Sequence, residues 1–194
     1  MNVKPASMGS NSEIPVIETQ RLRLRAHRYD DLPGCVAMWS DPSVTQYIGG
    51  RASTEQQTWA RLLAYLGHWA LLGFGYWAIE ERITGQYVGE VGFADFKRDV
   101  ARPMKGKPEL GFALSSRVHG RGYATEAVRA ALAWADAALQ YPSTVCLVNE
   151  QNLVSLRVVE KCGYAPFDRG VLNEQPVLFL SRSRHELAAG GKQT

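Results

Sequence analysis

A turn that contains glycine, set between a predicted strand and a predicted helix, constrains this sequence more than any other feature. The strand covers residues 109–115 (ELGFALS), the turn contains Gly120 and Gly122, and the helix runs from Tyr123 to Leu139. The first turn of a helix has N–H groups without intrahelical acceptors and carries a partial positive charge. Alternatively, the segment is only a strand-to-helix connection, in which glycine is needed for its backbone dihedral angles and not for binding. With two glycines at the helix start, the segment also predicts an anion site.

Two arginines in this turn strengthen the prediction of a phosphate ligand. Arg117 precedes the glycines and Arg121 lies between them, and each can form charge-assisted hydrogen bonds to a phosphate. A dinucleotide fingerprint does not fit, because Thr125 stands where a third glycine is needed and a hairpin precedes the strand. A P-loop does not fit either, because no Gly-Lys-Ser/Thr follows.

The remaining chain predicts an α+β domain with one mixed sheet. Alternating and apolar runs predict strands, and helical spacing with capping residues predicts helices. The strands are expected at 21–27, 74–81, 86–96, 109–115, 143–149 and 176–183, with a further short strand near Tyr164. The helices are expected at 30–41, stopped by Pro42 and followed by a loop, and at 54–72, 123–139 and 152–162.

Length and charge limit the kinds of partner. The 194 residues, 45% of them hydrophobic and 21% charged, predict one domain over 16–185 between a flexible leader (1–15) and a flexible tail (186–194). The net charge of +3 without a long Lys/Arg run favours an anionic small molecule over nucleic acid. No run of 18 apolar residues is present, so no membrane span is expected.

The cysteines and histidines give no sign of a disulfide frame or of a metal site. Cys35, Cys146 and Cys162 are odd in number, widely spaced and set among apolar residues, which predicts buried thiols in a reducing, cytoplasmic compartment. The four histidines have no metal-ligand spacing, so no metal is expected.

Three segments, in the right order, resemble the GNAT superfamily of acyl-CoA N-acyltransferases. RVHGRG fits that superfamily's Gln/Arg-x-x-Gly-x-Gly/Ala motif, and GYATEA continues it as in the ribosomal-protein N-terminal acetyltransferase (RimJ/RimL-like) branch. The N-terminal segment 19–49 and the segment 149–164 (NEQNLVSLRVVEKCGY) are similar to that branch as well. The resemblance covers about residues 18 to 180.

The resemblance implies a fold and a donor site. It implies a mixed, mostly antiparallel sheet of 6–7 strands, splayed where coenzyme A binds and flanked by about four helices. The motif backbone would hold the pyrophosphate, the strand before it would pair with the pantetheine arm, and an asparagine would hydrogen-bond that arm. The residues concerned are Phe112, Ala113, Leu114, Arg117, Val118, His119, Gly120, Arg121, Gly122, Tyr123, Ala124, Asn152 and Ser155.

Acyl transfer to an amine also needs a group that takes up a proton, because a free amine is mostly protonated at neutral pH. Glu109 is the first candidate and Glu90 the second, since both lie on strands expected at the sheet centre. Strand alternation places Glu109, Gly111 and Ala113 on one face. The plainer interpretation is that each glutamate is solvated at a strand end.

The leaving thiolate needs a proton in return. Many superfamily members use a tyrosine seven residues after the asparagine, but this chain has Val159 there. The ribosomal-protein branch commonly has a serine, which Ser155 matches, so Ser155 is the candidate acid. A side chain at this place can also simply cap or pack the helix.

Acetyl-CoA-dependent N-acetyltransfer to a primary amine, either a protein N-terminus or a small molecule, is therefore the leading hypothesis, with direct attack in a ternary complex. The alternative is a catalytically silent acyl-CoA-binding module. Val159 is consistent with it, because it stands where many superfamily members have the tyrosine. A nucleic-acid-binding interpretation rests only on the basic loop 97–107. Similar proteins are often homodimers, so the resemblance includes that state.

Overall fold

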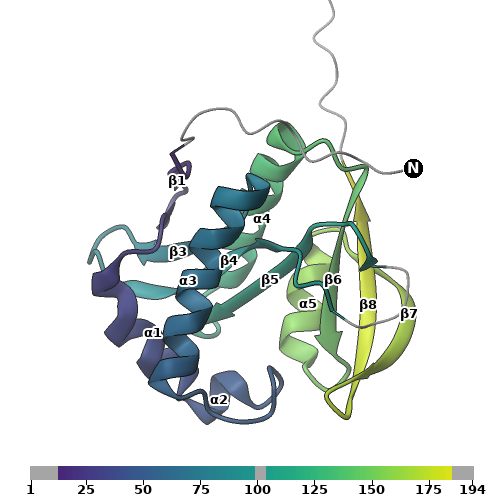
Figure 1. The fold of residues 1–194 in the computed structure, drawn as a ribbon, viewed down its shortest axis with the longest axis horizontal. Helices are drawn as coiled ribbons and strands as arrows, with labels where there is room; N and C mark the ends of the chain where they lie inside the picture. The colour runs from purple at the N-terminus through teal and green to yellow at the C-terminus, as the bar shows by residue number, and fades with distance from the viewer. Residues whose placement is uncertain (1–12, 99–103, 185–194) are drawn as a thin grey trace, which may run out of the picture.

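The computed structural model describes residues 13–98 and 104–184 and consists of one sheet covered by helices (Figure 1). Within those residues the sheet has eight strands in the order β1-β2-β3-β4-β5-β6-β8-β7. Neighbouring strands are antiparallel except β5 and β6, which are parallel. The strands are β1 (Ile17–Glu18), β2 (Leu22–Arg25), β3 (Tyr76–Glu81), β4 (Tyr87–Ala94), β5 (Glu109–Leu114), β6 (Ser143–Asn149), β7 (Ala165–Leu172) and β8 (Gln175–Ser183).

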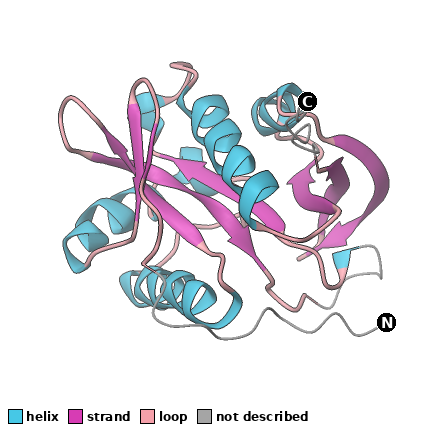
Figure 2. Cartoon of the chain, turned by 90° about the horizontal axis from the view of Figure 1, so that it is seen from above, coloured by secondary structure: helices cyan, strands magenta, loops and turns pink. Residues whose placement is uncertain are grey.

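Helices lie on both sides of the sheet (Figure 2). Along the described chain they are α1 (Leu32–Trp39), α2 (Pro42–Thr45), α3 (Glu55–Leu72), α4 (Tyr123–Ala138) and α5 (Leu153–Lys161), with 3-10 turns η1 (Tyr29–Asp31) and η3 (Ser116–Val118). The predicted capping box starts α3: the Thr54 hydroxyl accepts from the Gln57 amide at 3.2 Å, and the Gln57 side chain accepts from the Thr54 amide at 2.9 Å. The predicted α+β class is confirmed.

Three local differences from the sequence prediction have physical causes. Pro42 begins the short helix α2 instead of a loop, because proline suits the first helical position and Asp41 caps the helix by accepting from the Ser43 amide at 2.9 Å. β7 is a full strand of eight residues, but its side chains are mostly exposed and lack the alternation that marks a strand. The strand predicted to reach Phe96 ends at Ala94.

The chain ends lie mostly outside the described residues. The predicted tail 186–194, most of the predicted leader 1–15 and the centre of the basic loop fall there. Near the end of that leader, Ile14 packs against the main core, and the Pro15 carbonyl accepts a 2.8 Å hydrogen bond from the Trp77 indole. Ordered contacts therefore begin inside the segment that was expected to be flexible.

The two faces of the central strands differ in chemistry. Val91 pairs with Phe112 and Phe93 with Leu110, and these side chains pack in the main core with α4. Glu90 pairs with Ala113, and Ala94 pairs with Glu109, so the two glutamates share the opposite face. That face packs with α1, α2 and α3 through smaller apolar clusters. One face is thus a core, and the other also carries carboxyl groups.

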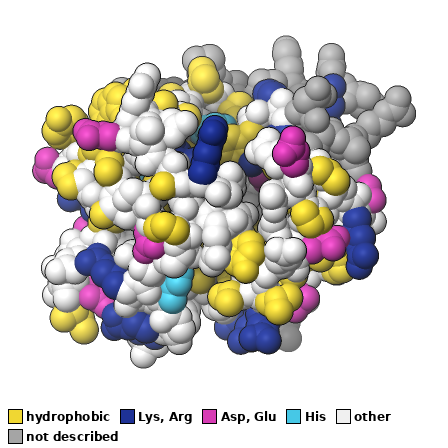
Figure 3. All heavy atoms as spheres, turned by 90° about the horizontal axis from the view of Figure 1, so that it is seen from below, with side chains coloured by type: hydrophobic (Ala, Val, Ile, Leu, Met, Phe, Trp, Pro, Cys, Tyr) yellow, Lys and Arg dark blue, Asp and Glu magenta, His cyan; other side chains and the backbone are white. Residues whose placement is uncertain are grey.

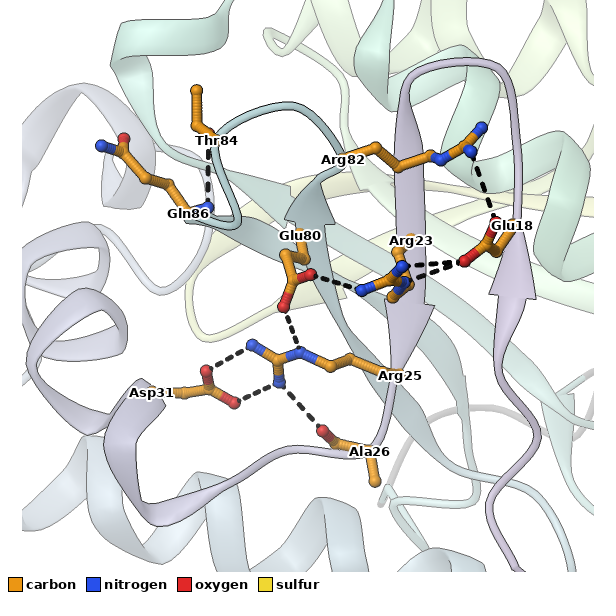
Figure 4. Close-up of polar contacts among 9 residues, drawn as sticks. All are labelled: Glu18, Arg23, Arg25, Ala26, Asp31, Glu80, Arg82, Thr84 and Gln86. Atoms are coloured by element: carbon orange, nitrogen blue, oxygen red, sulfur yellow. Dashed lines mark hydrogen bonds and ion pairs between the residues drawn. The ribbon is translucent and has the colours of Figure 1, made fainter.

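A buried ion network fixes the start of α1 against β2 and β3 (Figure 4). The Arg25 guanidinium donates to both carboxylate oxygens of Asp31 at 2.8 Å and to Glu80 at 2.7 Å. Arg23 joins the network by pairing with Glu18 and Glu80. Because Asp31 precedes α1, the network positions that helix, and with it Trp39, over the sheet.

Gly92 provides a test of how closely β3 and β4 pack. A Cβ atom added there would lie 2.3 Å from the Gly75 carbonyl oxygen and from the Tyr76 Cα, both backbone atoms that cannot move aside. Gly92→Ala should lower the free energy of unfolding by about 1–3 kcal/mol or more. Gly67→Ala, inside α3 where an added Cβ meets nothing within 4 Å, should raise it by about 0.5–1 kcal/mol. Denaturant unfolding measures both, and a Gly92→Ala protein as stable as wild type contradicts the packing described.

Candidate functional site

β5 and β6 part after two residue pairs. Only Glu109 with Val145 and Leu110 with Cys146 are in register, although β5 continues to Leu114 and β6 to Asn149. A cavity of about 290 Å³ lies at this opening, and its lining includes both strands, α3 and the first turn of α5. Backbone N–H and C=O groups of β5 between Gly111 and Leu114 therefore have no partner strand on the β6 side.

The glycine turn leads from this opening to α4. Gly120 and Gly122 have φ values of 75° and 78°, a left-handed conformation that other residues rarely adopt. Gly122 is the N-cap of α4 and has no side chain to occupy the end of the helix, so the first N–H groups of α4 face the turn. Val118 is buried, and the His119 ring is 2.9 Å from the Leu114 carbonyl oxygen. The predicted strand, glycine turn and helix are all present.

The charged side chains of the turn already have protein partners. Arg117 donates to the Gln86 side chain at 2.9 Å and to the Tyr87 carbonyl. Arg121 pairs with Glu81 at 3.2 Å, and that carboxylate also accepts from the Tyr123 hydroxyl at 2.6 Å. The sequence interpretation expected both arginines to be available to a phosphate. In the structure both arginines are engaged in contacts that hold the turn in place.

Asn152 and Ser155 lie together at the start of α5 and line the cavity. The Asn152 side-chain oxygen accepts from the Ser155 amide at 3.0 Å, so Asn152 is the N-cap and its NH₂ group is not used in the cap. Ser155 is half-buried, and Val159, one turn further on, is fully buried and also lines the cavity.

Glu90 is a buried carboxyl group at the cavity. It is 1% exposed and accepts hydrogen bonds from the hydroxyls of Tyr65 and Tyr87, the latter at 3.1 Å. Burial raises the pKa of the Glu90 carboxyl above its ordinary value, and the tyrosine hydrogen bonds and the charge of Arg61 oppose this only in part. Such a group changes its protonation state closer to neutral pH than a solvated glutamate does.

Glu109 lines the same cavity in a different environment. Its two oxygens accept three hydrogen bonds of 2.9–3.2 Å from the Arg98 guanidinium. Neither glutamate is solvated at a strand end, as the plainer interpretation had them, because both are at most 9% exposed. The structure brings Glu90, Glu109, Asn152 and Ser155 to one cavity.

Several residues of the cavity were not found from the sequence. Arg61, Tyr65 and Tyr76 line it, and Tyr65 and Tyr76 stack with ring centroids 4.2 Å apart. Tyr65 falls at helical spacing among core positions of α3, so its pattern is that of an ordinary core residue. Trp39 and Tyr47 also line the cavity, whereas Trp77 lies in the core.

Other sequence expectations concern ions, thiols and membranes. Cys35, Cys146 and Cys162 are buried free thiols, as predicted. Over residues 13–98 and 104–184, no group of three or more His, Cys, Asp or Glu residues is arranged to hold a metal ion. No helix of the described chain combines the length and apolarity needed to span a bilayer. On the face drawn in Figure 3, acidic and basic side chains are interspersed.

Comparison with known proteins gives the family. The model of the acetyltransferase (GNAT) domain matches residues 21–165, about three quarters of the chain. The chain belongs to the GNAT acetyltransferase family. A proposed GnaT-family acetyltransferase from Bordetella pertussis has 30% sequence identity and a TM-score of 0.78, with 88% of this chain and 100% of that chain covered.

Two further likenesses agree with the GNAT assignment. YoaA of Bacillus subtilis (strain 168), an uncharacterized N-acetyltransferase, is 28% identical over 167 residues, 82% of this chain and 87% of YoaA. RimL, a ribosomal L7/L12 alpha-N-protein acetyltransferase solved in complex with coenzyme A, has 14% identity and a TM-score of 0.70, with 87% of this chain and 98% of RimL covered. The RimL likeness is one of fold.

His27 gives a prediction on pH dependence. It is 5% exposed beside Tyr65 and Tyr87, and within the described chain its ring nitrogens have no hydrogen-bond partner. Burial lowers the pKa of His27 to about 4 from 6.5. The unfolded chain thus binds more protons between these pH values, so stability is full above pH 6.5 and falls as pH drops toward 4.

Between pH 6.5 and 4 the free energy of unfolding should fall by about 3 kcal/mol, because each unit of pKa shift corresponds to about 1.4 kcal/mol. His27→Phe should remove most of the change in unfolding free energy between pH 6.5 and 4, and denaturant unfolding at several pH values measures it. His68→Phe, at a less buried histidine on α3, is the control and should keep the wild-type slope. An unchanged slope in His27→Phe contradicts the assignment.

Proposed function

We propose that this GNAT protein is an acetyl-CoA-dependent N-acetyltransferase that acts on a primary amine in a ternary complex. The observation that carries the proposal is the opening between β5 and β6, which places unpaired strand backbone, the α5 cap and two carboxyl groups around one cavity. An extended donor and an amine can meet there. The coenzyme A in the RimL structure supports the choice of donor.

The donor would bind mainly through backbone groups. The unpaired edge of β5 at Phe112–Leu114 suits the amides of a pantetheine arm, much as a strand would, and the Asn152 NH₂ group adds a side-chain donor. In the turn of residues 118–124, the glycines have no side chain that would keep a pyrophosphate from the backbone amides. The positive end of α4 lies at the same place. Arg117 and Arg121 would act by fixing this turn.

The transfer itself needs two proton movements. The amine nitrogen attacks the thioester carbonyl, so that a C–N bond forms and the C–S bond breaks. The amine loses its surplus proton to a carboxylate, directly or through water, and the departing thiolate gains a proton. Ser155, half-buried at the cavity, is the proposed donor of that proton and regains one from water in the same step; a thiolate with a pKa of about 8.5 needs little assistance.

The surroundings of the two glutamates favour Glu90 as the proton acceptor, although sequence reasoning placed Glu109 first. Glu90 is held by neutral tyrosine hydroxyls, and burial raises its pKa, which suits proton uptake near neutral pH. Glu109 has both oxygens engaged by Arg98 and is proposed to supply fixed negative charge near the ammonium form of the acceptor.

Acetyl-CoA binding is the first test. Titration calorimetry on the full chain should give saturable binding at micromolar concentrations, and thiol release with a panel of peptides, polyamines and amino acids should show turnover. Gly122→Val should weaken binding at least 10-fold, because a β-branched residue is strained at φ 78° and covers the helix end. Binding without thiol release for any amine would support the silent acyl-CoA-binding module instead, the candidate that the buried Val159 keeps open.

Replacing the glutamates separates their roles. Glu90→Gln should lower kcat by about 10²- to 10⁴-fold and flatten the acid side of the pH–rate profile, because the rate then no longer depends on that carboxyl losing a proton. Glu109→Gln should lower the rate less and keep the shape of the profile. Acetyl-CoA affinity and thermal unfolding are the controls for both. If Glu90→Gln keeps the wild-type profile and Glu109→Gln loses it, Glu109 is the acceptor.

A further inference from the structure

Arg61 is a partly buried arginine whose surroundings differ from those of the arginines that pair with carboxylates. Arg25 pairs with Asp31 and Glu80, and Arg182 pairs with Asp136, each at 2.6–2.8 Å. Arg98 pairs with Glu109 in the same way. The Arg61 guanidinium lies over the Trp39 ring, 3.8 Å from its centroid, and within the described residues its buried Nε has no hydrogen-bond partner and the side chain makes no ion pair.

The pKa of the Arg61 guanidinium is raised against the effect of burial by Tyr65 and Glu90 nearby, yet within the described residues Glu90 forms no ion pair with it. Arg61 projects from α3 and lines the same cavity as Glu90 and Glu109. Removing a guanidinium from water is costly unless an anion or several acceptors compensate it. Stacking on an indole face satisfies the guanidinium above and below its plane but leaves its N–H donors, which lie in that plane. The cavity thus contains a cation whose donors suit an external anion.

The cavity residues other than Arg61 indicate which further chemical groups the acceptor should have. Glu90 and Glu109 share one sheet face with the ring of Tyr76, and Tyr65 stacks on Tyr76. An amine suits the carboxyl groups, a carboxylate suits Arg61, and a neutral apolar group suits the aromatic wall. The cavity of about 290 Å³ also has to admit the end of the donor arm, so the space left for the acceptor suits a small molecule.

From this arrangement, and resting on the proposed function, we infer that the acceptor is a small zwitterion: an α-amino acid with a free carboxylate, anchored by Arg61. The Arg61 fork matches a carboxylate with two parallel hydrogen bonds. A peptide N-terminus has a neutral amide where the amino acid has this carboxylate, and a polyamine presents only cations to Arg61. Both are therefore disfavoured as acceptors.

Matched acceptors test the inference on the wild-type protein. For several neutral L-amino acids, such as L-phenylalanine and L-methionine, thiol release from acetyl-CoA is compared among the free acid, its carboxamide and its decarboxylated amine. Rates are expressed per unprotonated amine, because the carboxamide loses its amine proton at a lower pH. The free acid should have a kcat/KM at least 10-fold higher than either analogue.

Variants at Arg61 then tie the preference to this residue. Arg61→Met should lower kcat/KM for the free acid about 100-fold and leave the carboxamide within about 3-fold, so that the preference disappears. Arg61→Lys should restore part of it, since a lysine keeps the charge but not the planar fork. Arg51→Met, at an exposed arginine outside the cavity lining, is the matched control and should behave as wild type.

The outcomes distinguish this inference from the proposed function. Failure of acetyl-CoA to bind the folded wild type overturns the proposed function. Turnover of polyamines, peptides or carboxamides at or above the rate of the free acids supports the proposed function and overturns the zwitterion inference. An equal loss for acid and carboxamide in Arg61→Met, with unchanged acetyl-CoA affinity and thermal unfolding, also overturns it, because Arg61 would then not bind the carboxylate.

Discussion

The parallel contact between β5 and β6 ends after two residue pairs, and the cavity depends on that ending. Antiparallel neighbours on both sides hold the two strands firmly, β4 along β5 and β8 along the whole of β6. β5 and β6 can therefore diverge while each keeps its hydrogen bonds to its antiparallel neighbour. Each has a rigid outer partner, and only their facing edges are left unpaired. Exposed strand edges usually invite pairing with another chain. In this fold the edge lies inside a cavity, where an extended ligand can use it.

The central strands serve two purposes because their faces alternate. Residues such as Val91 and Phe93 bury one face against α4, and this core supplies the hydrophobic stabilisation. The opposite face is then free to carry Glu90, Tyr76 and Glu109 under α1 and α3. Gly92 and Gly111 lie between these polar residues, and the Tyr76 side chain fills the space above Gly111, where a Cβ would lie 1.9 Å from its hydroxyl. The small residues thus make room for the large polar ones.

The fold was largely predictable because its signals are local. A capping box, a glycine at a helix end and two-residue alternation each depend on a few neighbouring residues, and the elements they predict are present. The site was less predictable, because its decisive contacts join distant segments. The pairing of Arg98 with Glu109, and the position of Arg61 beside Trp39, join residues that lie well apart in the sequence. β7 gave almost no signal, since its exposed side chains break the alternation.

The contrast between the two glutamates follows from what surrounds each one. A guanidinium holds Glu109 through both oxygens. Glu90 accepts hydrogen bonds from hydroxyl groups, and burial raises its pKa although these bonds and the charge of Arg61 oppose the rise. Two carboxyl groups on one sheet face thereby have different surroundings. Under the proposed chemistry the acceptor amine uses both: Glu109, held in place by Arg98, lies beside it in the cavity, and Glu90 takes its proton when it attacks.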